Sequence, residues 1–167
     1  MFKEISPNEL SGNVFDYIGD RWMLICAQDG SGANLMTASW GGLGVIWTRP
    51  ASFIFVRPQR YTKKLVDAAA GYSLLFFDEI YREQLNLCGV KSGRDIDKFA
   101  ACNFTLDFHG GIPYAKEAER AIFCRKLYTQ DMLYDCFNDK DVAKEIYPKE
   151  DYHTMYVGEV TSVLVKD

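Results

Sequence analysis

Apolar side chains along the chain gather in short alternating or continuous runs, a pattern typical of β-strands rather than long helices. The clearest runs are RWMLICAQD at 21–29, ANLMTASW at 33–40, ASFIFVRP at 51–58, YSLLFFD at 72–78, FTLDFH at 104–109, AERAIFCRKLYTQ at 118–130 and YHTMYVGEVTSVLV at 152–165. Most are bounded by Gly, Pro, Asn or Asp, which are common turn residues. The pattern predicts seven or eight strands.

Helical periodicity is confined to short segments between these strands. They are NVFDYIGD at 13–20, YTKKLVDAAAG at 61–71, YREQLNLCG at 81–89, RDIDKFAAC at 94–102 and DKDVAKEIYP at 139–148. Thr62 is expected to cap the second segment, and Ser92 with Asp95 resembles a capping box before the fourth. GGLGVIWTRP at 41–50 is expected to be a glycine-rich loop. Because long helices do not alternate with the strands, we expect a mainly β fold, an antiparallel barrel with peripheral helices.

Composition and charge narrow the classes of function. The 167 residues contain no internal repeat or linker, so residues 1–167 are expected to form a single domain. The net charge of -4 argues against nucleic acid or an anionic membrane as partner, and no apolar run is long enough to cross a membrane. Five scattered cysteines and a polar N-terminal segment, MFKEISPNEL, predict a reducing, cytoplasmic location.

The common catalytic and metal-binding motifs are absent from the sequence. No GxSxG, HExxH or P-loop occurs, and two histidines cannot form a three-histidine metal site, so no catalytic residue and no metal ligand is predicted. His109 is expected in an exposed turn, while His153 either contacts a ligand or ends a strand. The cysteines are expected to pack as small apolar residues.

The segment VRPQRYTKKLV at 56–66 concentrates positive charge at the start of a predicted helix. It carries Arg57, Arg60, Lys63 and Lys64 around Thr62. Helix N-termini bind anions through free N–H groups, and arginine adds bidentate contacts to phosphate, so a phosphate site is one interpretation. A charged helix facing solvent is the other. Lys98 is likewise either a surface lysine or a ligand contact.

The stretch NLMTASWGGLGVIWTRP at 34–50 mixes small polar groups, tryptophans and glycines in an apolar context. Backbone amides and hydroxyls on a strand can border a planar heteroaromatic ring, and Trp40 can stack on it or wall it. A phosphate at one end and a flat ring at the other describe flavin mononucleotide (FMN). GSGANL at 30–35 lacks the third glycine of a dinucleotide-binding fingerprint and carries little weight.

The ordered set NLMTASWGGL, VRPQRYTKKLV, YSLLFF, SGRDIDKF and YVGEV resembles the flavoredoxin branch of the flavin reductase-like family, over roughly residues 10 to 165. The resemblance implies an FMN-binding split barrel, antiparallel and Greek-key-like. It also implies a homodimer with one non-covalent FMN per subunit near the interface.

The same resemblance implies the residues that bind FMN. Residues 34–40 are expected along the isoalloxazine and ribityl chain, Thr62 with its neighbours at the phosphate, Lys98 of DKF near the flavin, and His153 just before GEV. The full implied set is Asn34, Met36, Thr37, Ala38, Ser39, Trp40, Arg57, Gln59, Arg60, Tyr61, Thr62, Lys98 and His153.

Two departures from the family pattern concern the mouth of the site. TRPAS has a single proline, Pro50, where two are usual, and segment 128–151 is longer than a minimal member needs and could cover the flavin. The implied function is an oxidoreductase that passes electrons from NADH, NADPH or a protein donor through FMN to a free flavin or a redox partner protein. The alternative is an FMN-binding electron carrier or sensor without a nicotinamide site.

Overall fold

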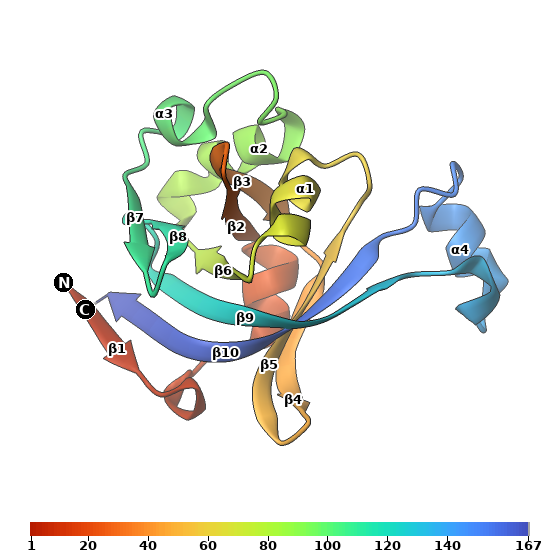
Figure 1. Cartoon of the computed structure of the whole chain (residues 1–167), viewed down its shortest axis with the longest axis horizontal. Coiled ribbons are helices and arrows are strands. Elements are labelled where there is room, and N and C mark those ends of the chain that lie inside the picture. The colour runs from red at the N-terminus through yellow and green to blue at the C-terminus, as the bar shows by residue number, and fades with distance from the viewer. Residues whose placement is uncertain (167) are drawn as a thin grey trace.

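The computed structural model describes residues 1–166 as a strongly curved antiparallel sheet, with the short helices of residues 61–102 gathered at one end and a further helix on a projecting arm (Figure 1). The strands are β1 (Phe2–Ile5), β2 (Met23–Asp29), β3 (Gly32–Ala38), β4 (Gly41–Ile46), β5 (Arg49–Val56), β6 (Gly71–Phe76), β7 (Leu106–His109), β8 (Ile112–Ala115), β9 (Arg120–Asp131) and β10 (Thr154–Lys166). The helices are α1 (Tyr61–Ala68), α2 (Arg82–Val90), α3 (Lys98–Cys102) and α4 (Lys140–Ile146). Single helical turns are η1 (Pro7–Glu9), η2 (Asp16–Asp20), η3 (Glu79–Tyr81) and η4 (Tyr134–Cys136). The predicted mainly β class is confirmed.

Seven strands of the main sheet follow the order β3-β2-β6-β9-β10-β5-β4, and β1 pairs with β10. All of these pairs are antiparallel, while β7 and β8 form a separate hairpin. The register of β9 and β10 shifts between Val157 and Gly158 and again between Val160 and Ser162. Such bulges bend a strand and increase its twist, which lets these two long strands curve through the sheet.

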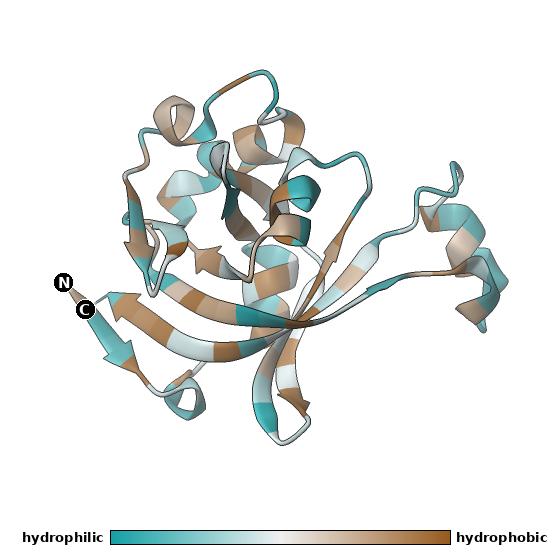
Figure 2. Ribbon diagram, in the orientation of Figure 1, coloured by the Kyte–Doolittle hydropathy of each residue, from teal (hydrophilic) through white to brown (hydrophobic). Residues whose placement is uncertain are grey.

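The sheet buries side chains on both faces, which explains the continuous apolar runs in the sequence. On β2, Met23 and Ile25 belong to the core enclosed by the curved sheet, whereas Leu24 and Cys26 face a second core under α2, α3 and β8. Each fully buried large side chain contributes about 1.5–3 kcal/mol. In Figure 2, brown apolar positions recur along the strands between white and teal ones.

The structure corrects the expected loop at 41–50, because residues 41–46 form strand β4 paired with β5. A Cβ on Gly41 would lie 2.7 Å from the carbonyl oxygen of Phe53, so glycine permits the close approach of the two strands. Trp47 and Thr48, both with positive φ, make the tight turn between them. The short strands β1 and β8 were also absent from the sequence-based prediction.

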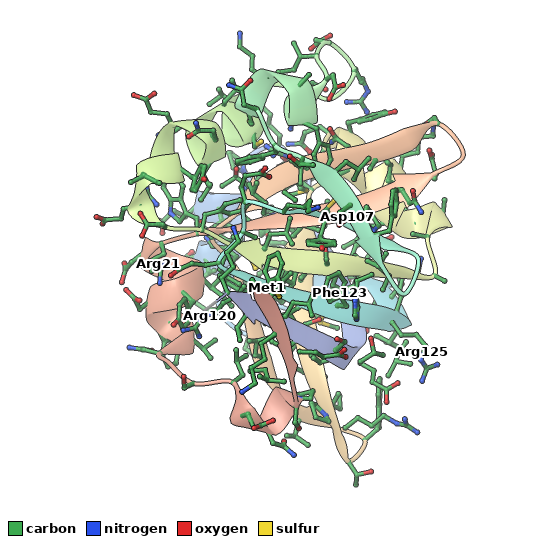
Figure 3. All side chains as sticks on the ribbon, turned by 90° about the vertical axis from the view of Figure 1, so that its left-hand side faces the viewer. Met1, Arg21, Asp107, Arg120, Phe123 and Arg125 are labelled. Carbon is green, nitrogen blue, oxygen red and sulfur yellow. The ribbon has the colours of Figure 1, made fainter. Side chains whose placement is uncertain are left out.

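Opposite ends of the molecule differ in shape. Residues 132–153, between β9 and β10, form an arm that carries α4 and projects away from the barrel (Figure 1). At the other end, Met1 precedes β1, and Arg21 and Arg120 lie near one another (Figure 3), each over the ring of Tyr17. No helix within residues 1–166 is long and apolar enough to span a membrane.

Candidate functional site

Strand β3 forms one wall of the candidate site, where one of its side chains contacts α1 and one of its backbone carbonyls contacts α3. Asn34 is buried and its Nδ2 donates a hydrogen bond of 2.8 Å to Oγ1 of Thr62 on α1. On the next residue, the carbonyl of Leu35 accepts a hydrogen bond of 2.8 Å from Nζ of Lys98 on α3. Since β3 is an edge strand, one line of its backbone groups pairs with no other strand.

Helix α1 begins beside Asn34 without a side-chain cap. Its N-cap residue is Arg60, whose side chain makes no capping hydrogen bond. Thr62, expected as the cap, instead lies in the first turn and accepts the bond from Asn34. The first N–H groups of a helix have no intrahelical acceptor, and an uncapped end is suited to an anion.

Two cations meet near this helix end. The guanidinium of Arg60 donates to the carbonyls of Gly89 (2.7 Å) and Cys88 (3.2 Å), at the C-terminal end of α2. Nζ of Lys98 donates to the same Cys88 carbonyl at 2.8 Å. Lys98 is only 3% exposed, so its interpretation as a surface lysine is wrong.

Burial lowers the pKa of Lys98 to about 8 and also lowers the pKa of Arg60. Within residues 1–166, neither side chain forms an ion pair with a carboxylate. Backbone carbonyls accept two hydrogen bonds from each side chain but leave both positive charges uncompensated. The arrangement is therefore suited to a doubly charged anion.

Two adjoining hollows open at this place. A small one of about 90 Å³ lies between the start of α1 and the loop 89–93, and a larger one of about 600 Å³ lies over residues 31–34 and 93–99. Tyr61, Gly93 and Lys98 line both. Their combined size falls in the range of small-molecule and cofactor sites.

Sequence reasoning missed Gly93, which closes the site. A Cβ on Gly93 would lie 2.3 Å from Oδ1 of Asn34 and 2.7 Å from Cδ1 of Tyr61, so only glycine brings this loop against β3 and α1. We call Asn34, Arg60, Thr62, Gly93 and Lys98 the binding corner. The SG pair within SGRDIDKF was the available signal for Gly93.

The loop after Gly93 also differs from its predicted capping. Asp97, rather than Ser92 and Asp95, caps α3, since its Oδ1 accepts hydrogen bonds from the backbone N–H groups of residues 99 and 100. Arg94 reaches back over the ring of Tyr61, 5.4 Å from its centroid, and donates to the carbonyl of Gln59 at 3.1 Å. Sequence reasoning did not select Arg94.

A second group of predicted residues contacts the base of the arm. Arg57 and Gln59 both bind Oδ2 of Asp151, at 2.6 and 2.8 Å. Nδ1 of His153 lies 2.7 Å from the hydroxyl of Tyr147, and burial lowers the pKa of His153 to about 4. The structure therefore places Arg57 beside the arm rather than beside Arg60 and Lys98.

Trp40 connects the end of β3 to this second group. Its ring centroid lies 5.0 Å from that of His153, and both Ser39 and Trp40 are exposed. Met36 and Ala38 point into the core. Because side chains alternate between the two faces of a strand, these two cannot contact a ligand that lies on the surface. The hydroxyl of Thr37 donates to the carbonyl of Leu85.

His109 was expected in an exposed turn, but the structure places it at the end of β7. Its Nε2 is 3.0 Å from the hydroxyl of Ser162, and its ring packs on Phe123. The arm meets predicted site residues at its base, where Arg57 contacts both Asp151 and the last residue of α4, Ile146, while the rest of α4 projects outward (Figure 1).

Solved structures with the same fold belong to flavoproteins. Flavoredoxin from Methanosarcina acetivorans superposes with a TM-score of 0.72 at 21% identity, over 95% of this chain and 75% of that one. An FMN-binding domain of a flavin reductases-like enzyme from Shewanella baltica gives 0.71 at 12% identity, over 99% and 77%. A Shewanella frigidimarina protein with a split barrel domain gives 0.69 at 18% identity, over 96% and 77%. These likenesses confirm the predicted split-barrel fold.

Sequence comparison identifies the family. No curated protein shows significant sequence similarity to the chain. The profile of the flavin reductase like domain, however, matches residues 16–167, which is most of the sequence. This match confirms the family predicted from the ordered motifs: the chain belongs to the flavin reductase-like domain family.

Proposed function

We propose that the protein binds FMN without a covalent bond and holds its phosphate in the binding corner. The observation that carries this proposal is a pair of cations, the buried Lys98 and the half-buried Arg60, with no carboxylate partner beside the uncapped start of α1. A phosphate dianion would compensate both charges and accept hydrogen bonds from the first N–H groups of the helix. The solved FMN-binding domain from Shewanella baltica has the same fold, which is consistent with this choice of ligand.

We propose that the flavin ring lies towards the far end of β3. In this arrangement the ribityl chain follows the strand from Asn34, and the ring reaches Ser39 and Trp40, which are exposed. Trp40 and His153 would then bound the ring on the side of the arm. Met36 and Ala38 support the strand from within the core, so they set its position rather than touch the ring.

FMN supplies hydride and electron chemistry when it is bound, and the protein supplies binding, orientation and electrostatics. Lys98 places a positive charge next to β3, and the unpaired edge of β3 offers backbone N–H groups to the polar rim of a ring. Such groups favour negative charge on the ligand and would raise its reduction potential. The chain needs no acid–base pair of its own, which fits the absence of a catalytic motif.

The reaction that we propose is electron transfer from NADH, NADPH or a protein donor, through FMN, to a free flavin or a protein acceptor. We further propose a homodimer with the flavin near the interface. A carrier or sensor without a nicotinamide site remains the alternative function.

FMN binding is tested by titration of purified protein, followed through flavin fluorescence. Arg60→Ala removes charge-assisted hydrogen bonds worth about 1.5–3 kcal/mol, so affinity should fall roughly tenfold or more. Lys63→Ala is the matched control, because it removes one positive charge from the same helix. The side chain of Lys63 pairs with Asp67 and takes no part in the binding corner. A protein that does not bind FMN, or equal affinities for both variants and the parent, would contradict the assignment.

A nicotinamide assay separates the proposed enzyme from the alternative. Rapid bleaching of bound FMN on mixing with NADH or NADPH supports the oxidoreductase. Absent bleaching, together with rapid oxidation of chemically reduced protein by a redox protein, supports the carrier. Light scattering tests the dimer, and a monomer that still binds FMN tightly would contradict the interface position.

A further inference from the structure

Two cysteines face each other directly behind the binding corner. Sγ of Cys88 on α2 lies 3.6 Å from Sγ of Cys102, the last residue of α3. Both thiols belong to the second core, yet none of the predicted roles uses them. Within residues 1–166, no other cysteine forms a hydrogen bond to a second sulfur: Cys26 and Cys124 are buried in strands, and Cys136 is exposed in the arm.

The surroundings of this thiol pair are electropositive and asymmetric. Nζ of Lys98 and the guanidinium of Arg60 both bind the carbonyl of Cys88. Donation from the thiol of Cys88, assisted by the positive charge of Lys98, lowers the pKa of Cys102, whereas that hydrogen bond and burial raise the pKa of Cys88. Cys102 is also the thiol with some exposure, 3% against 0% for Cys88. One sulfur is thus prepared to react first and the other to follow.

We propose that Cys88 and Cys102 form a reversible disulfide when the protein meets hydrogen peroxide, and that this bond weakens ligand binding in the corner. The part that concerns the ligand rests on the proposed FMN function. The sulfurs must approach from 3.6 Å to about 2.0 Å, the length of a disulfide, which requires α2 and α3 to shift slightly towards each other.

The chemistry balances with peroxide as the oxidant. The thiolate of Cys102 attacks one peroxide oxygen, the O–O bond breaks, and hydroxide leaves and takes up a proton. The thiol of Cys88 then attacks the sulfenic sulfur of Cys102, the S–O bond breaks, and a second water leaves as the S–S bond forms. Two thiols are oxidised and one peroxide is reduced to two waters. Peroxide is close to water in size, so it can reach a thiol with little exposed surface.

The link to the corner is the backbone of Cys88. Its carbonyl accepts hydrogen bonds from both Arg60 and Lys98, and the adjacent Gly89 carbonyl accepts another from Arg60. A movement of Cys88 towards α3 therefore moves the acceptors that position both cations. We expect the oxidised protein to bind FMN about 5- to 150-fold more weakly, the range usual for coupling between two sites.

The experiment uses the full chain with Cys136→Ser, which removes the exposed thiol. Protein without FMN is treated with limiting peroxide, remaining thiols are alkylated, and peptides are mapped by mass spectrometry. The expected result is a cross-linked pair of peptides, one with Cys88 and one with Cys102, while Cys26 and Cys124 stay reduced. A dithiol reductant should cleave the cross-link and restore both thiols. Cys102→Ala should abolish the cross-link, and Cys26→Ala, in the same core, should keep it.

Peroxide treatment that leaves both thiols free, or that oxidises Cys102 without a cross-link, overturns the disulfide. FMN titration of the reduced and cross-linked forms then tests the coupling, and equal affinities overturn it. If neither form binds FMN, the proposed FMN function fails, whereas the disulfide result stands on the peptide map alone.

Discussion

The binding corner and the base of the arm each hold part of the predicted site, but by different kinds of contact. In the corner, Asn34 and Thr62 form a buried hydrogen bond, and Lys98 is almost fully enclosed. At the arm, Arg57 and Asp151 form an ion pair whose side chains remain 27% and 20% exposed. Buried polar groups are costly when unpaired, whereas water and salt screen exposed ion pairs.

Because of this difference, we expect the two regions to open under different conditions. The corner is tied to both cores through β3, so we expect it to open only when the barrel unfolds. Apart from the two ends of the ribbon, the arm reaches the barrel through the polar contacts of Arg57 and Gln59 and through a few aromatic contacts, so we expect it to open locally. A site built across both would combine a fixed phosphate pocket with a movable wall beside the ring.

The largest expected effect comes from breaking the corner. Thr62→Val keeps the shape of the side chain but leaves the buried Nδ2 of Asn34 without an acceptor, which costs about 1–3 kcal/mol. The free energy of unfolding, measured in urea, should fall by this amount for the whole barrel. Thr129→Val, on an exposed part of β9, is the control and should change little. Equal stability of the two variants would show that the corner is not tied to the barrel.

A second effect concerns the charge buried in the corner. Because the pKa of Lys98 is about 8 in the folded protein and 10.5 in its ordinary state, the unfolded chain binds more protons between these values. Stability of the free protein should therefore rise with pH across that window. FMN affinity should instead fall as pH rises through about 8, by up to about tenfold per pH unit, because the phosphate loses its cation.

Fluorescence titrations of FMN across this pH range measure the second trend, and Lys98→Met should flatten it. A pH dependence that persists unchanged in Lys98→Met would assign the titration to another group.

The smallest effect is expected from loosening the arm. Arg57→Ala removes the ion pair with Asp151 and the cation over the ring of Tyr147, each with an effect of less than about 1 kcal/mol. Limited proteolysis should then cut residues 132–153 faster, while hydrogen exchange of the barrel strands stays the same. Arg49→Ala removes a comparable ion pair, with Glu159, and should not alter cleavage of the arm. Faster exchange throughout the barrel would instead make the arm part of the same cooperative unit.

The sequence predicted what depends on local pattern. The run at 21–29 is apolar on both faces because β2 lies between two cores, so its strand was evident. Arg60 and Thr62 were found because they share one short motif at a helix start, and Lys98 was found through the family resemblance.

What the sequence did not predict depends on contacts between distant segments. Gly93 matters because Asn34 lies against it from another strand, and no local pattern reports that approach. The burial of Lys98 follows from the meeting of α2, α3 and β3. Strand β4 was not predicted because its glycines are typical of loops. At Gly41, however, the absence of a side chain lets two strands pair closely.

The attachment of the arm has a consequence for how this fold can diversify. Asp131 and Thr154 are partners across the ribbon of β9 and β10, and their side chains share a hydrogen bond. Everything between them thus connects two positions that a short turn could connect equally well. We therefore expect that lengthening, trimming or replacing residues 132–153 leaves the strand register unchanged, so that natural variation or design can exchange this segment without rebuilding the barrel.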